Sequence, residues 1–88
     1  MAVNWRRPRT HIGRLLRKHR RSLKITQAEA AKRVGYGRQH YNRLENGSCL
    51  LALDAIYSVA DGLGIPDDVL TQAALADRMP VGWEAVQA

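Results

Sequence analysis

The sequence predicts an all-α fold, a compact bundle of five short helices. Apolar residues recur three or four positions apart over most of residues 10–76, which is the spacing of one buried helix face. Phe is absent and aromatic residues make up only 6% of the chain, so Leu, Ile, Val and Ala have to build the core. That composition favours helices over strands. The 88 residues suffice for one domain.

Three parts of the chain can be separated by their patterns. Residues 1–9 (MAVNWRRPR) have no helical period and contain a proline, which predicts an irregular basic N-terminal arm. Residues 10–76 hold all five expected helices. Residues 77–88 contain Pro80 and Gly82, and we expect them to form an irregular C-terminal tail.

The first expected helix begins after Thr10, a residue type that commonly caps helix N-termini. One face of this helix carries the stripe that we expect to be buried: Ile12, Leu15, Leu16, His19 and Leu23. The rest of its circumference is basic: Arg14, Arg17, Lys18, Arg20 and Arg21. The pattern predicts an amphipathic helix that packs one side on the core and exposes a cationic side.

The second expected helix opens at Thr26, and Glu29 stands three residues later, which is the spacing of a capping box. Its inner face is small: Ala30, Ala31 and Val34. Gly35 follows where a left-handed residue would end the helix. The sequence therefore predicts a short helix over these residues with a tight turn after it.

The third expected helix begins after Gly37. Tyr41 and Leu44 face inward at helical spacing, while the other side carries long hydrogen-bonding side chains: Arg38, Gln39, Asn42 and Arg43. A short helix, a glycine-containing turn and a second helix with polar side chains at its start indicate a helix-turn-helix, the arrangement that places a helix in the DNA major groove.

Two further helices complete the expected bundle. The fourth carries the stripe Leu53, Ile56, Val59, Ala60 and Leu63, and we expect Gly62 and Gly64 to stop it. The fifth begins at Ile65-Pro66, has acidic residues in its first turn where they complement the helix dipole, and buries Leu70, Ala73 and Ala74.

Leu50 and Leu51 stand side by side in the connection before the fourth helix. Two adjacent leucines in a loop indicate either a contribution to the core or an exposed apolar contact, and the second would suit a dimer interface. Trp83 either folds back on the bundle or contacts a second subunit. Leu50, Leu51 and Trp83 are thus the candidate subunit contacts.

The net charge of +6 is divided unevenly along the chain. Residues 1–43 hold thirteen Lys or Arg and one acid, a net charge of +12, whereas residues 44–88 hold one base and seven acids, a net charge of −6. The basic half contains the helix-turn-helix pattern. This coincidence indicates a polyanionic partner, although a charge run alone is commonly just a solvated surface.

The sequence lacks the residue patterns that are typical of metal-binding proteins, enzymes and membrane proteins. The three histidines are dispersed and no Cys/His pair has a metal-ligand spacing, so we expect no metal or cofactor. Cys49 neighbours leucines instead of an activating base, and no glycine-rich loop follows a strand, which argues against an enzyme. No apolar run approaches the ~20 residues of a membrane span, and no signal peptide is visible. A single cysteine fits a reducing cytoplasm, so we expect a cytoplasmic, nucleoid-associated protein that is bacterial or phage-encoded.

Over about residues 12–70 the chain resembles the phage-repressor and Cro-like helix-turn-helix family. The resemblance is carried by Thr26-Gln27, Ala31, Gly35 and Leu44-Glu45-Asn46-Gly47, followed by Leu53, Ile56, Val59, Ala60, Leu63-Gly64 and Leu70. Two positions depart from the family pattern. Ala30 replaces a leucine, and Gly37 replaces the Ser or Thr that usually caps the recognition helix. The resemblance implies a lambda-repressor-like bundle.

The resemblance also implies roles for individual residues. Arg38, Gln39 and Arg43 occupy the family's base-reading positions. Backbone contacts are implied at or near Gln27, Gly37, His40, Asn42 and Asn46, and expected from basic residues of the arm and first helix: Arg6, Arg7, Arg9 and Arg17. Glu45 is expected to pair with an arginine of the domain, because a carboxylate facing phosphates would repel them. The arm is equally compatible with a generic basic tail.

Together these features predict a sequence-specific double-stranded DNA-binding transcription regulator, a repressor that acts by occupying its operator. We expect a homodimer on an inverted repeat, with no membrane and no small-molecule substrate. Two other functions fit the same sequence. One is a protein-interaction module on this scaffold, such as an antitoxin-like protein or an accessory protein of a phage or mobile element, and the other is a nucleic-acid binder that ignores sequence.

Overall fold

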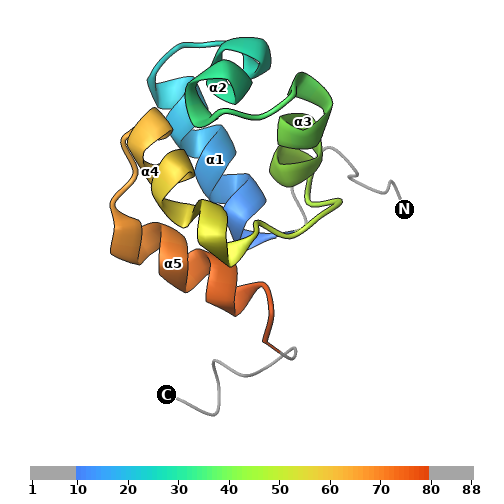
Figure 1. Cartoon of the computed structure of the whole chain (residues 1–88), viewed down its shortest axis with the longest axis vertical. Helices are drawn as coiled ribbons and strands as arrows, with labels where there is room; N and C mark the ends of the chain where they lie inside the picture. The colour runs from blue at the N-terminus through green and yellow to red at the C-terminus, as the bar shows by residue number, and fades with distance from the viewer. Residues whose placement is uncertain (1–9, 80–88) are drawn as a thin grey trace, which may run out of the picture.

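A computed structural model describes residues 10–79 of the chain, and within them it shows five α-helices and one 3-10 turn but no strand (Figure 1). In order along the chain, the elements are α1 (His11–Ser22), α2 (Gln27–Val34), α3 (Arg38–Asn46), η1 (Leu53–Ala55), α4 (Ile56–Leu63) and α5 (Asp67–Ala76). The predicted all-α five-helix fold is confirmed.

Helix α1 contacts α3, α4 and α5, while α2 packs on α3 and α4. In Figure 1, α3 lies at one side of the bundle and the connection from α4 to α5 lies at the other. All five helices supply buried side chains, and those of the core are mostly aliphatic, as the composition requires: Ile12, Leu16, Ala30, Ala31, Val34, Tyr41, Leu44, Leu51, Ile56, Val59, Ala60, Leu63, Ile65, Leu70 and Ala74.

Two side chains cap the start of α1. The hydroxyl of Thr10 accepts from the backbone N–H of Gly13 at 2.9 Å, which confirms Thr10 as the N-cap. The carboxylate of Asp77 accepts from the N–H of His11 at 2.6 Å and from that of Ile12 at 3.1 Å. These bonds satisfy three N–H groups that lack partners within the helix. Asp77, from the expected tail, is therefore tied to the bundle.

The boundaries of α2 agree with the sequence pattern. The Thr26 hydroxyl accepts from the N–H of Glu29 at 3.1 Å, one half of the expected capping box, while the Glu29 carboxylate lies 3.6 Å from Nε of Arg33. Gly35 ends the helix with φ +80°, a left-handed conformation that glycine adopts without strain.

Two positions of the expected buried stripes and one expected helix end are wrong. Leu23 is 41% exposed because α1 ends one residue earlier, and Leu53 is 50% exposed because residues 53–55 form a 3-10 turn whose rotation differs from that of α4. Gly62 lies inside α4 instead of stopping it. The helix ends at Gly64, which has φ +69°.

The two adjacent leucines before η1 differ in burial. Leu51 is fully buried in the core, and the guanidinium of Arg78 donates to its carbonyl oxygen, whereas Leu50 is 47% exposed. The structure therefore corrects the candidate subunit contact at Leu51, because a side chain already enclosed by its own domain has no surface to offer. Leu50 is exposed and stays a candidate subunit contact.

Candidate nucleic-acid interface

One face of α3 is exposed and polar. Arg38, Gln39, Asn42 and Arg43 are all exposed and line a shallow, open hollow of the surface. They come from two successive turns of the same helix, so their side chains point to one side. The structure thus brings the three predicted base-reading residues together with Asn42 on a single accessible face.

The opposite face of α3 is anchored in the core. Tyr41 and Leu44 are fully buried, as their spacing predicted. Glu45 is also fully buried, and Arg20 of α1 binds both of its oxygens: Nε donates to Oε2 at 2.9 Å and Nη2 donates to Oε1 at 2.8 Å. The expectation that Glu45 pairs with an arginine of the domain is confirmed. A two-bond pair of this kind fixes the direction of α3 as well as its distance from α1.

Burial by itself would raise the pKa of Glu45, since it disfavours the charged carboxylate. Hydrogen bonds from Arg20 and Gln27 outweigh that effect, and the pKa of Glu45 is lowered from its usual value. The same pair raises the pKa of Arg20. Both partners therefore stay charged inside the domain, and Arg20 additionally donates to the carbonyl of Ile25 at 3.1 Å.

A chain of side-chain hydrogen bonds runs from the buried carboxylate to the surface. Gln27 Nε2 donates to Glu45 Oε1 at 3.2 Å, and Asn42 Nδ2 donates to Gln27 Oε1 at 3.1 Å. Asn46 Nδ2 then donates to Asn42 Oδ1 at 3.1 Å. Ser48 donates to Asn46 Oδ1 through its N–H at 3.0 Å and through its hydroxyl at 2.6 Å. Three candidate phosphate contacts thus form one continuous network.

Two candidate phosphate contacts also serve the buried carboxylate. Arg17 Nε lies 3.4 Å from Glu45 Oε1, and the Arg17 side chain is 24% exposed. Gln27 is half-buried, and its Nε2 bond to Glu45 uses one of the two hydrogens that an amide NH₂ carries. Both side chains are therefore positioned by Glu45 while part of each still reaches solvent.

The start of α3 lacks a side-chain cap. Gly37 is its N-cap residue, as predicted, and contributes no side-chain hydrogen bond. Next to it, the rings of Tyr36 and His40 are stacked, with centroids 4.5 Å apart and planes inclined by 7°. Tyr36 is half-buried against the core and His40 is exposed.

A family model described as a helix-turn-helix domain matches residues 11–74. The chain belongs to the helix-turn-helix domain family. This membership agrees with the resemblance to phage repressors and Cro-like proteins, and it suggests DNA as the partner. Neither a search of curated proteins nor a search of solved structures finds a match.

In this helix-turn-helix domain α2 and α3 form the motif itself, and residues beyond it hold it in place. Sequence reasoning did not single out Arg20 as the partner of Glu45, because Arg20 is one of five basic residues on α1 with the same local pattern. It also missed the Tyr36–His40 stack, for which two aromatic rings four residues apart were the available signal.

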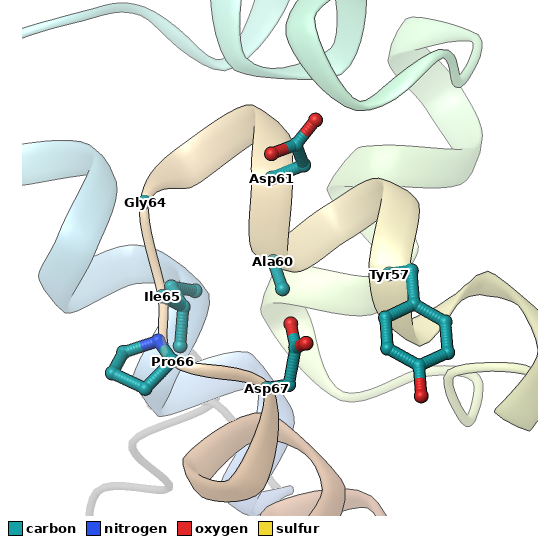
Figure 2. Close-up of a pocket in the computed structure, with 7 residues that line it drawn as sticks. All are labelled: Tyr57, Ala60, Asp61, Gly64, Ile65, Pro66 and Asp67. Atoms are coloured by element: carbon teal, nitrogen blue, oxygen red, sulfur yellow. The ribbon is translucent and has the colours of Figure 1, made fainter.

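A second surface hollow of the helix-turn-helix domain lies at the junction of α4 and α5 (Figure 2). It is lined by Tyr57, Ala60, Asp61, Gly64, Ile65, Pro66 and Asp67. Asp61 and Asp67 are exposed there, and carboxylates repel phosphates, so this surface is unsuited to DNA.

The sequence also led to expectations about the arm and tail residues, metal binding, membrane spans and Cys49. Arg6, Arg7, Arg9 and Trp83 lie outside the described residues. Among residues 10–79 no cluster of His, Cys, Asp and Glu could hold a metal ion, and no described helix is long and apolar enough to cross a membrane.

Burial raises the pKa of the half-buried Cys49 thiol, although the positive charge of Arg43 acts in the opposite direction. A raised pKa means that a smaller fraction of Cys49 is in the reactive thiolate form.

Proposed function

We propose that this helix-turn-helix protein is a non-enzymatic transcription regulator of the cytoplasm that binds double-stranded DNA sequence-specifically and represses by occupying its operator. The observation that carries the proposal is the exposed row of Arg38, Gln39 and Arg43 on the outer face of α3. In a helix-turn-helix the second helix enters the major groove, and residues of its first turns contact base edges.

The chemistry of this row suits base reading. The forked guanidinium of Arg38 or Arg43 can donate two hydrogen bonds to O6 and N7 of guanine, and the amide of Gln39 can pair with N6 and N7 of adenine. Each such two-bond contact contributes about 1–3 kcal/mol of discrimination against a wrong base. We therefore assign these three side chains to sequence recognition.

The surrounding polar groups suit the sugar–phosphate backbone. Gln27, Asn42 and Asn46 are hydrogen-bonded to one another, so they can bind phosphates as a rigid set that fixes the position of α3 on the duplex. His40 and Gly37 at the start of α3, and Arg17, which contacts Glu45 near its end, are further candidate backbone contacts, as are the arm residues Arg6, Arg7 and Arg9. Backbone contacts of this kind set affinity and its salt dependence.

We further propose that the protein binds an inverted repeat as a homodimer. A single small domain covers too little DNA for tight specific binding, and two-fold symmetric helix-turn-helix proteins place their recognition helices about 10 bp apart or a multiple of it. The exposed Leu50 and the tail residue Trp83 are the candidate subunit contacts.

Selection of bound duplexes from a random pool tests the proposal directly. We expect one enriched palindrome, bound at least roughly 10³-fold more tightly than random DNA at the same salt concentration. Arg38→Ala should relax the preference at one base position. Arg21→Ala, which removes the same charge from an exposed site on α1, should weaken every duplex by the same factor.

Two other results would overturn the proposal. Binding that falls steeply with salt and enriches no duplex would identify a charge-driven polyanion binder. Absence of DNA binding altogether would favour a protein-interaction module on the helix-turn-helix scaffold.

A further inference from the structure

The turn between α2 and α3 contains a contact that the base-reading row does not explain. Tyr36 lies in this turn and His40 in the first turn of α3, and their rings stack at 4.5 Å between centroids with an interplanar angle of 7°. Nearly parallel rings at that separation leave neither side chain free to rotate without losing the contact.

Tyr36 is held on its other sides. Its backbone N–H donates to the carbonyl of Ala31 at 2.9 Å, and its half-buried ring packs against the core. Burial is the main cause of the raised pKa of its hydroxyl, followed by the charges of Asp54 and Cys49. The ring is therefore a fixed platform for whatever stacks on it.

His40, by contrast, is exposed and stands two residues after Arg38 in the first turn of α3. Since Tyr36 covers one face of the exposed imidazole, the rest of the ring, with its two nitrogens, is the part left to contact a ligand. An imidazole held in one orientation can donate an N–H to an oxygen without first losing its rotational freedom.

We propose that Tyr36 is a positioning residue for DNA binding, which acts by holding the edge of His40 toward the sugar–phosphate backbone beside the base-reading row. The proposal rests on the DNA-binding function proposed above. The stack lies beside Gly37, whose lack of a side chain leaves the start of α3 without a side-chain cap.

Substitutions that separate the flat ring from its apolar bulk test this role. Tyr36→Phe keeps the ring and should bind the selected duplex like the wild type. Tyr36→Leu keeps apolar packing on the core but removes the flat face, and we expect roughly three- to tenfold weaker binding, the cost of fixing one free side chain. Tyr57→Leu, at a 73% exposed tyrosine of α4, is the matched control and should change nothing.

A double-mutant cycle then shows whether the effect passes through His40. In a His40→Ala background, Tyr36→Leu should cost no further affinity, because the side chain that it positions is gone. The loss should be the same on the selected duplex and on its single-base variants, since a backbone contact carries no sequence information.

The outcomes distinguish this inference from the proposed function. If the wild type selects a duplex but Tyr36→Leu binds it equally well, or if the losses from Tyr36→Leu and His40→Ala simply add, the positioning role is overturned and the DNA-binding function stands. If the wild type selects no duplex, both proposals are wrong.

Discussion

Gly62, inside α4, packs directly against the carbonyl group of Arg33 near the end of α2. A Cβ atom at Gly62 would lie 2.6 Å from the Arg33 oxygen and 2.9 Å from its carbon. These two atoms belong to the backbone of α2, so they cannot move unless the whole helix shifts. Helix α2 in turn packs against α3. The glycine is required here by close approach of two helices, since it lies within α4 and does not end it.

Gly62→Ala is therefore expected to destabilise the protein by about 2 kcal/mol, the typical cost of overpacking, even though alanine is the better helix former. Denaturant titration followed by circular dichroism measures the change. Asp61→Ala, at the exposed neighbouring residue of α4, also gains helix propensity, without a clash. It should stay within about 0.5 kcal/mol of the wild type, and an equally stable Gly62→Ala would contradict the close packing.

Glu45 should make the domain sensitive to acid. Its pKa is lowered in the folded state, so its contribution to stability is complete above the unfolded value of about 4.3 and is lost as the pH falls through the lowered folded value. Removing the charge by Glu45→Gln leaves the half-buried Arg20 without its charged partner, at a cost of about 2 kcal/mol near neutral pH.

The free energy of unfolding, measured from pH 7 to pH 2 for both proteins, checks this expectation. The wild type should lose more stability than Glu45→Gln in the acid range, so the two curves should converge. Parallel curves would show that the carboxylate is not the group responsible.

The buried hydroxyl of Tyr41 is expected to lower the stability of the fold, because burial removes its hydrogen bonds with water. It is fully enclosed, and no described group meets the distance and angles of a hydrogen bond to it, although the Glu45 carboxylate and the Arg20 guanidinium lie close enough to interact with it. Burial, followed by the negative charge of Glu45, raises the pKa of this phenol well above its usual value.

Tyr41→Phe removes this unsatisfied group and keeps the ring, so we expect unchanged or higher stability, by up to about 1 kcal/mol. Thermal unfolding of this variant beside Tyr57→Phe, at an exposed position, measures the effect. A loss of more than about 1 kcal/mol for Tyr41→Phe would mean that the hydroxyl has a hydrogen-bond partner after all.

Restoring a cap to α3 should stabilise the domain. Gly37 has φ −66° and ψ 151°, which any residue adopts, and a Cβ there would meet no atom within 4 Å. Gly37→Ser adds a hydroxyl that can accept from an N–H of the first turn, for a gain of a few tenths of a kcal/mol.

Gly37→Ala is the matched variant, because it adds the Cβ without the oxygen and should be less stable than both the serine variant and the wild type. Melting temperatures in the same buffer give the order. An alanine variant as stable as the serine variant would show that the missing hydrogen bond is immaterial at this position.

Local signals in the sequence predicted much of this fold. Thr10, Thr26 and Gly35 act within three or four residues of their partners, so their roles could be inferred from spacing alone. The buried positions of Tyr41 and Leu44 followed from helical period. The stripes failed where an element changed type or ended, as at Leu53 in the 3-10 turn.

Contacts between distant segments could not be predicted in this way. Asp77 caps a helix that begins 66 residues earlier, and no local pattern marks that partnership. Arg20 is chosen for Glu45 from among several basic residues by the way α1 crosses α3. On the candidate interface, the sequence placed Arg38, Gln39 and Arg43 on one helix face, but it did not show that Gln27, Asn42 and Asn46 share one network.

The uneven distribution of charge has a kinetic consequence. The basic residues lie mainly on α1–α3, whereas Asp54, Asp61, Asp67 and Asp68 lie on η1, α4 and α5, so the molecule carries a large electric dipole. This separation of charge should turn the basic helices α1–α3 toward a polyanion before first contact. The rate of association with a polyanion should therefore be high at low ionic strength and fall as salt is added, because salt screens the attraction.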